Sequence, residues 1–162
     1  MKNNLINNPS EYLQQHKDNP VHWQIWSNET LDLAKKEKKP ILLSVGYASC
    51  HWCHVMAHES FEDAKTAEIM NKNFINIKVD REERPDIDFV FQSSFQLFNQ
   101  SSGGWPLTMF LDENGVPFMG GTYFPKKEQH GLPSFENVLK KISSVYKEQG
   151  DKIKNQVELI KK

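Results

Sequence analysis

Cysteine is scarce in this chain: two in 162 residues, too few for a disulfide-stapled scaffold at this length. Long apolar runs are missing as well, and no stretch approaches the length of a membrane span. The formal net charge is only −1, which gives no electrostatic reason to expect nucleic acid or a membrane surface as a partner. With 38% hydrophobic and 25% charged residues, the composition is that of a soluble globular domain with a proper core.

The N-terminal stretch "MKNNLINNPSEYLQQ" has no continuous apolar segment, so we expect no secretory signal and a cytoplasmic, reducing setting. In that setting, a close pair of cysteines is more often catalytic, redox-sensing or metal-binding than structural. The two cysteines and their neighbours are therefore the first candidates for function.

Hydrophobic patterning predicts helices that alternate with short buried strands. We expect Ser10 to cap a short helix and Ser27 or Asn28 to cap a longer one that ends at Pro40. The other expected elements are a strand at 40–47, a helix from about 52 to 70, a strand at 73–80, a helix at 85–98, a hairpin of strands at 106–111 and 116–121 around Asn114-Gly115, and a helix at 134–150 ending at Gly150. An alternating half followed by a hairpin predicts an α/β fold with a mixed sheet flanked by helices.

Three parts of the chain are expected from this pattern. Residues 1–26 form an N-terminal extension that Trp23 and Trp26 pin onto the core. Residues 27–150 form the main domain, and residues 151–162 form a C-terminal helix or linker.

Cys50 and Cys53 lie in "YASCHWCHVM", directly after the first predicted strand and at the start of a helix. A helix N-terminus presents unpaired N–H groups and a positive dipole end, which favour a thiolate, the attacking species. Cys50 would form a mixed disulfide with a substrate, and Cys53, one turn later, would resolve it. Between them, a protonated His51 would favour the reduced form, while Trp52 either offers an apolar surface to a partner or is simply packed.

Trp105-Pro106 precedes the third predicted strand and supports the dithiol interpretation. Aromatic-Pro bonds are candidates for cis geometry, and such a loop can pair its backbone with an extended peptide. The alternative is a trans proline that simply starts an edge strand.

A zinc or copper site is the first alternative, because His54 and His58 can share a helical stripe with Cys50, near Cys53 and Glu59. Structural zinc sites usually draw ligands from two separated segments, and the chain has no second cluster. The remaining histidines are scattered: His16, His22 and His130. We therefore expect no bound metal.

The run from Cys50 to His54 also fits the haem c attachment pattern. That chemistry requires export and a haem pocket built around the motif, and both the N-terminal sequence and the strand before Cys50 argue against it. We expect no cofactor.

Several longer stretches resemble one known family: "NPVHWQIW", "KKPILLSVGYASCHWCHVMAHESFED", "IKVDREERPDID", "GGWPLTMFLDENGVPF" and "GGTYFP". In order, and over nearly the whole chain, they resemble the thioredoxin-like N-terminal domain of the family that includes human spermatogenesis-associated protein 20 and its bacterial relatives. The resemblance implies a thioredoxin fold, with Cys50 as nucleophile, Cys53 as resolving thiol and Pro106 as the cis-proline. It also implies a longer parent protein that continues past Lys162 into a helical, toroid-like domain.

The chain departs from ordinary thioredoxins in two places. His51-Trp52 replaces the Gly-Pro between the cysteines, and Ser44 stands where thioredoxins carry a buried acid for proton transfer. His54 or Glu59, close in sequence, are the candidates to replace that acid. The charged run "DREERP" at 80–85 is either an ion-paired loop near the site or a solvated turn.

The predicted function is thiol–disulfide exchange with a protein or small-molecule disulfide or dithiol, catalysed by Cys50 and Cys53. His51, Trp52, His54 and Glu59 are expected to modulate the site, and Trp105 and Pro106 to bind substrate. The alternatives are a non-enzymatic thioredoxin-fold interaction module of a larger protein and a Cys/His metal-binding domain.

Overall fold

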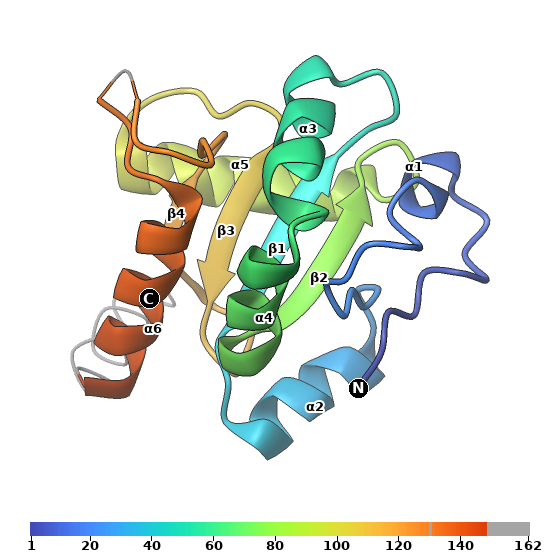
Figure 1. The fold of residues 1–162 in the computed structure, drawn as a ribbon, viewed down its shortest axis with the longest axis horizontal. Coiled ribbons are helices and arrows are strands. Elements are labelled where there is room, and N and C mark those ends of the chain that lie inside the picture. The colour runs from blue at the N-terminus through green and yellow to red at the C-terminus, as the bar shows by residue number, and fades with distance from the viewer. Residues whose placement is uncertain (130, 149–162) are drawn as a thin grey trace.

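Four strands form one mixed sheet at the centre of the computed structural model, which describes residues 1–129 and 131–148 (Figure 1). The strands are β1 (Ile41–Gly46), β2 (Ile75–Asp80), β3 (Leu107–Leu111) and β4 (Pro117–Gly121), in the order β2-β1-β3-β4. β1 is parallel to β2 and antiparallel to β3, which pairs antiparallel with β4. The predicted mixed α/β sheet is confirmed.

Six α-helices and one π-helical segment surround the sheet in the described residues. They are α1 (Glu11–Gln14), α2 (Asn28–Glu37), α3 (His51–Met56), η1 (Ala57–Phe61), α4 (Ala64–Asn73), α5 (Pro85–Asn99) and α6 (Phe135–Glu148). The side chains of Ser10 and Ser27 accept backbone N–H groups at the starts of α1 and α2, so the predicted serine caps are confirmed. The cap expected at Gly150 and the segment 151–162 lie outside the described residues. Within the part that is described, no helix is long and apolar enough to cross a membrane.

The prediction of a single helix from about 52 to 70 is wrong. After α3 the chain widens into η1, where the N–H of Glu62 donates to the carbonyl of Ala57, and the helix then stops. Asp63 is extended (φ −84°, ψ 123°) and caps α4, and its carboxylate accepts from both the backbone N–H and the hydroxyl of Thr66 in the first turn of that helix. A side chain that satisfies the next helix's free N–H groups competes with continuation of the previous one.

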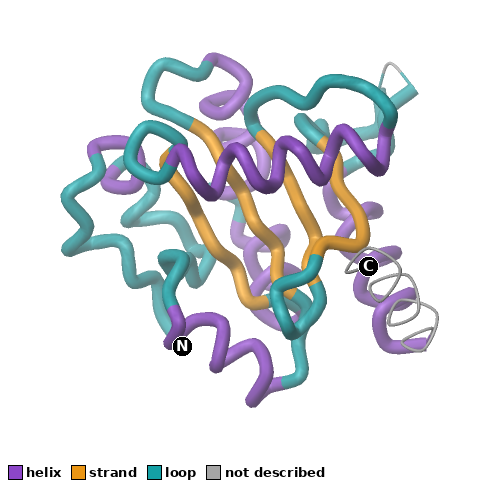
Figure 2. The backbone as a smooth tube through the Cα atoms, turned by 180° about the vertical axis from the view of Figure 1, so that it is seen from behind, coloured by secondary structure: helices purple, strands orange, loops and turns teal. Residues whose placement is uncertain are grey.

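Alternate residues of the strands point to opposite faces of the sheet, and each face has its own core. Leu42 packs on one face with α3, α4 and α6, which lie in front of the sheet in Figure 1. Ile41, Leu43 and Val45 point to the other face, which α5 crosses in Figure 2. Consequently Ser44 and Gly46 lie on the α3 face. Their partners on the neighbouring strand β2, Lys78 and Asp80, share that face.

The N-terminal segment runs beside β2 and extends the sheet edge. The N–H of Gln24 donates to the carbonyl of Asn76 (2.8 Å), and the N–H of Lys78 donates to the carbonyl of Gln24 (3.0 Å). Trp23 is fully buried on the α3 face, while Trp26 packs edge-on against Phe91 of α5. The segment therefore covers the edge of β2, which would otherwise be open. The expected division of the chain into three parts, with boundaries after residues 26 and 150, stays a prediction.

Candidate active site

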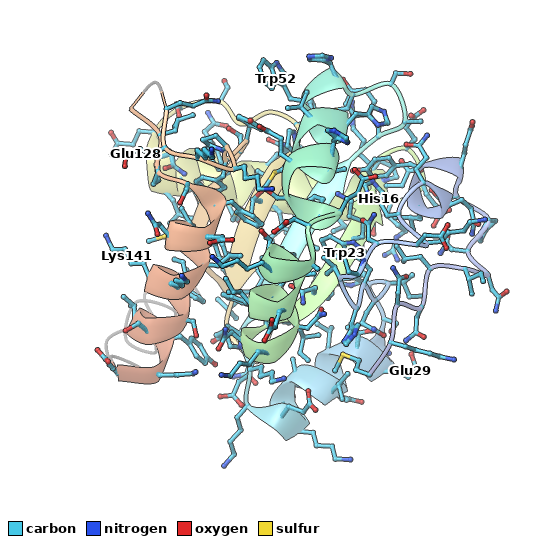
Figure 3. The ribbon with its side chains drawn as sticks, in the orientation of Figure 1. His16, Trp23, Glu29, Trp52, Glu128 and Lys141 are labelled. Atoms are coloured by element: carbon cyan, nitrogen blue, oxygen red, sulfur yellow. A yellow bond between two sulfur atoms is a disulfide. The ribbon has the colours of Figure 1, made fainter. Side chains whose placement is uncertain are left out.

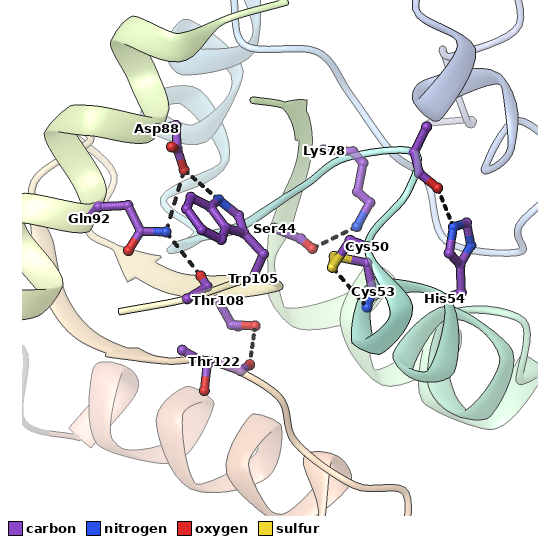
Figure 4. Close-up of a disulfide and its surroundings, with 12 residues drawn as sticks. Ser44, Cys50, Cys53, His54, Lys78, Asp88, Gln92, Trp105, Thr108 and Thr122 are labelled. Atoms are coloured by element: carbon purple, nitrogen blue, oxygen red, sulfur yellow. Dashed lines mark hydrogen bonds between the residues drawn. A yellow bond between two sulfur atoms is a disulfide. The ribbon is translucent and has the colours of Figure 1, made fainter. Parts of the chain in front are cut away.

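Cys50 and Cys53 form a disulfide at the point where the chain leaves β1 and enters α3 (Figure 4). Cys50 is the N-cap of α3, and its Sγ accepts the backbone N–H of Cys53 at 3.2 Å. Both cysteines are nearly inaccessible, with 3% of Cys50 and 1% of Cys53 exposed. The sequence places this pair because β1 ends at Gly46 and a short turn carries the chain directly into the helix.

Tyr123 connects Trp52 and Glu59 near the disulfide. Trp52 is half exposed at the outer surface of α3, as Figure 3 shows, and its ring lies 5.0 Å from that of Tyr123. The hydroxyl of Tyr123 donates to the carboxylate of Glu59. Partial burial and this hydrogen bond raise the pKa of Tyr123 to about 12, so its phenol stays protonated. Trp52 is thus supported by Tyr123, a residue that sequence reasoning missed.

His51, His54 and His58, which lie in or just after the cysteine motif, have separate partners. His51 is exposed and stacks edge-on against Trp52. His54 donates from Nε2 to the carbonyl of Ala48 at 2.6 Å, and His58 pairs with Glu62 at 3.1 Å. Within residues 1–129 and 131–148, no group of three or more His, Cys, Asp or Glu side chains is arranged to hold a metal ion.

Trp105 and Pro106 are joined by a cis peptide bond just before β3. Two residues of α5 hold this loop: Asp88 accepts from Nε1 of Trp105 (2.9 Å), and Gln92 donates to the carbonyl of Gly104 (2.9 Å). Neither was identified from the sequence, although their i, i+4 spacing on a mostly apolar helix was a usable signal.

Arg81 connects the charged loop to this site. Its guanidinium lies 4.2 Å above the ring of Trp105, and its Nε is 3.5 Å from the Asp88 carboxylate, an ion-pair rather than a hydrogen-bond distance. Arg84, in the same loop, pairs at 3.0 Å with Asp86 in the first turn of α5. The run "DREERP" is therefore the ion-paired loop and not merely a solvated turn.

A groove of about 580 Å³ lies between the Trp52–Tyr123 pair and the loop before β3. Trp52 and Tyr123 border it from the cysteine side and Trp105 from the loop before β3. The other lining residues are Phe95, Ser101, Ser102, Gly103, Gly104, Thr122, Gln129 and Leu132. Aromatic rings and exposed loop backbone in one groove are suited to an extended peptide.

A buried lysine, Lys78 of β2, is drawn next to the disulfide in Figure 4. Nζ of Lys78 donates to the hydroxyl of Ser44 at 2.8 Å, and only 1% of the residue is exposed. Burial lowers the pKa of Lys78 to about 7. Sequence reasoning missed this residue, and the available signal was a lysine inside a strand predicted to be buried.

The family model described as "Protein of unknown function, DUF255" matches residues 2–162 of this chain. Spermatogenesis-associated protein 20 of Rattus norvegicus is 48% identical over 146 residues, which are 90% of this chain and 18% of that protein. The chain spans about a fifth of the length of the curated relatives it matches.

Two solved structures share the fold. A DsbH oxidoreductase superimposes with a TM-score of 0.57 at 18% identity, covering 79% of this chain and 85% of that one. A thioredoxin from Thermus thermophilus superimposes with a TM-score of 0.50 at 17% identity, covering 78% and 87%. At these identities the likeness establishes a thioredoxin-like fold.

Proposed function

The chain belongs to the DUF255 family, and from that premise we propose that it catalyses thiol–disulfide exchange through Cys50 and Cys53. The observation that carries the proposal is the disulfide itself, placed at the β1–α3 junction beside an aromatic groove. The DsbH oxidoreductase and the thioredoxin with which the chain shares its fold lend support by analogy.

In the reducing direction, the Cys50 thiolate attacks one sulfur of a substrate disulfide. The substrate S–S bond breaks, and its electron pair leaves on the second sulfur, which takes a proton from water. Cys53 then attacks Sγ of Cys50 as a thiolate and releases the first substrate sulfur. The substrate is reduced to two thiols, and the Cys50–Cys53 dithiol is oxidised to the disulfide; the oxidising direction is the reverse.

The assignment of Cys50 as the attacking thiol rests on its hydrogen bonding. Its Sγ accepts the backbone N–H of Cys53, and a hydrogen bond to the charged form stabilises a thiolate. Cys53 is equally buried and has no such donor among the described residues, which suits the resolving role.

The groove between Trp52 and Trp105 supports a peptide or protein disulfide as the substrate. An extended segment would lie along the backbone at Gly103 and Gly104, with apolar side chains against the rings. Trp105 and Pro106 would then bind substrate, while His51, Trp52 and Glu59 shape the rim.

Two serine variants test the proposal. After reaction with glutathione disulfide or a cystine-containing peptide, Cys53→Ser should accumulate a mixed disulfide at Cys50, detected by mass spectrometry. Cys50→Ser should form none at that position and should lose turnover. The Cys50→Ser/Cys53→Ser protein is the control for chemistry outside the pair. Absence of exchange by the reduced wild-type protein with both substrates would reject the proposal.

The direction of exchange follows from the reduction potential of the pair, measured by equilibration with glutathione. A potential above the cytosolic glutathione poise assigns an oxidase or isomerase role, and one well below it assigns a reductase. We propose that this exchange takes place in the cytoplasm.

A second candidate is a non-enzymatic interaction module, favoured by the small share of its relatives' length that the chain spans. Under that proposal, the groove binds a partner and the thiols are structural or regulatory. A full-length relative carrying serine at both cysteine positions would then keep its full function, whereas the enzymatic proposal predicts that this function is lost.

A further inference from the structure

Lys78 is a buried amine with no carboxylate paired to it in the described part of the chain. Among the residues described, Nζ makes one hydrogen bond, to the Ser44 hydroxyl 2.8 Å away. Three aromatic rings surround Nζ, with centroids at 5.1 Å (Tyr12), 5.3 Å (Trp23) and 4.7 Å (Phe61). Burying a lone ammonium is costly, and an apolar side chain would fill the same space without that cost. The position therefore calls for a chemical explanation.

Cys53 lies over the same face of β1 as this amine. Ser44 and Gly46 are alternate residues of β1 and point to the same side. Sγ of Cys53 lies 2.8 Å from the point where a Cβ on Gly46 would be, and the Tyr12 hydroxyl is closer still. Lys78 of β2, through Ser44, and Cys53 of α3, above Gly46, thus approach neighbouring positions of β1 on the same face of the sheet, and Figure 4 shows the two side chains together.

Tyr12 lies between the two groups. Its ring contacts Nζ of Lys78, and its hydroxyl reaches the point above Gly46 that the Cys53 sulfur also approaches. This hydroxyl is buried and has no hydrogen-bond partner among the described residues. An unpartnered donor and acceptor beside a thiol is placed to pass a proton.

Resolution of a mixed disulfide requires a base near Cys53. A thiol buried in apolar surroundings has a raised pKa and holds its proton, although only the thiolate attacks. Ser44, at the position of the thioredoxin acid, has no titrating group. The two candidates from sequence have partners elsewhere: His54 donates to the carbonyl of Ala48, and Glu59 accepts from Tyr123.

We propose that Lys78 is the internal base that takes the Cys53 proton during resolution and returns it during reduction, a role that rests on the exchange function proposed above. The neutral amine accepts the thiol proton directly or through the Tyr12 hydroxyl, and becomes an ammonium. The Cys53 thiolate attacks Sγ of Cys50, the bond from Cys50 to the substrate breaks, and the electron pair leaves on the substrate sulfur, which water protonates. In the reverse direction, the ammonium protonates Cys53 as its sulfur leaves Cys50.

The charge states around Lys78 agree with this role. Burial lowers the pKa of Lys78 to about 7, so the amine exchanges a proton near neutrality. On the α1 side, burial keeps Tyr12 protonated and lowers the pKa of His16 to about 3, so both are neutral there. On β2, the Asp80 carboxylate accepts from the Ser10 hydroxyl. From α3, the facing groups are the two cysteines and His54, which is engaged with Ala48.

The decisive measurement is the titration of Cys53, which needs no turnover. Cys50→Ala leaves one thiol in the chain, so the ultraviolet absorbance of the thiolate reports Cys53 alone. Adding Lys78→Met should raise the apparent pKa of Cys53 by about one unit or more, a roughly tenfold loss of thiolate at neutral pH. Adding Lys141→Met instead, an exposed lysine of α6, should leave it unchanged. Equal titration with and without Lys78 overturns the proposal.

Rates separate this proposal from the exchange function. In Lys78→Met with both cysteines present, the mixed disulfide at Cys50 should form at the wild-type rate and resolve about tenfold more slowly at neutral pH, recovering at alkaline pH. Wild-type resolution with an unchanged pH profile removes the role of Lys78 and leaves the exchange function intact. A wild-type protein that forms no mixed disulfide rejects the exchange function, whatever the Cys53 titration gives.

A variant-free measurement covers the case in which Lys78→Met does not fold. The Lys78 side chain can be followed by NMR in isotope-labelled wild-type protein, oxidised and reduced. Its titration midpoint should differ between the two forms, because a titrating thiol beside it appears only on reduction. The same midpoint in both forms would contradict the proposal.

Discussion

Trp105 and Asp88 tie the loop before β3 to the first turn of α5, through a 2.9 Å hydrogen bond from the indole Nε1 to Oδ1 of the carboxylate. Asp88 is only 6% exposed, and Arg81 contributes its charge from the neighbouring loop. Because Trp105 lines the groove, this bond connects the helix behind the sheet with the surface proposed to receive substrate.

Trp105→Phe should weaken substrate binding more than chemistry. The substitution keeps a ring beside Arg81 and Tyr47 but removes the donor to a buried carboxylate, which costs about 1–2 kcal/mol of unfolding free energy. KM for a peptide disulfide should rise several-fold, while kcat changes little because the cysteines stay in place. Urea denaturation and steady-state kinetics measure both effects. Trp26→Phe, remote from the groove, is the control, and an equal rise in KM there would contradict the interpretation.

Gly46→Ala should destabilise the protein and disturb the dithiol. A Cβ at this position would lie 2.8 Å from Sγ of Cys53 and closer still to the Tyr12 hydroxyl, so one of them must move. We expect a loss of about 1–3 kcal/mol in unfolding free energy and a shifted reduction potential. Gly104→Ala is the matched control, because an added Cβ there meets nothing within 4 Å. Equal unfolding free energies of the two variants would show that the Cys53 sulfur and the Tyr12 hydroxyl move away from an added Cβ at little cost.

Trp52→Ala should affect substrate binding without affecting the fold. The side chain is 52% exposed and rests on Tyr123, so its removal should change unfolding free energy by no more than about 0.5 kcal/mol. KM for an aromatic or aliphatic peptide disulfide should rise several-fold, with a smaller effect on glutathione disulfide. Phe89 is an exposed aromatic residue of α5 outside the groove, so Phe89→Ala should leave the KM for both substrates unchanged. A Trp52→Ala protein with unchanged KM for peptide disulfides argues that the ring is merely packed.

Acid should destabilise the protein through His16. Burial lowers the pKa of this imidazole to about 3, against about 6.5 in the unfolded chain, so between these values only the unfolded state takes the proton. Unfolding free energy should therefore fall as pH drops from 6.5 towards 3, with a contribution approaching about 1.4 kcal/mol per pH unit.

His16→Gln should flatten that slope in urea titrations at a series of pH values. His58→Gln, at an exposed histidine paired with Glu62, should leave it unchanged. An identical slope in the His16 variant and the wild type would assign the acid sensitivity to other groups.

Local signals in the sequence were enough to predict most elements of the fold. β1 and β2 were recognised as buried strands, α5 as a helix beginning at Pro85, and the hairpin from its Asn114-Gly115 turn. Each of these depends on neighbouring residues: an apolar run, a proline at the first helical position, or a glycine with positive φ. The uninterrupted helix from about 52 to 70 failed because a π-turn and the Asp63 cap break it, and the apolar spacing carries no sign of either.

The sequence by itself placed Cys50 and Cys53 where a strand meets a helix, because that information is contained in a few consecutive residues. Only the tertiary structure brought Asp88 to Trp105, Tyr123 to Glu59, and Lys78 to Tyr12. These pairs come from segments far apart in the chain, and their contacts depend on which strands are neighbours and which face each residue takes. Strand register, which no local pattern encodes, paired Lys78 with Ser44 and so left a buried amine on the face of the sheet that carries the dithiol.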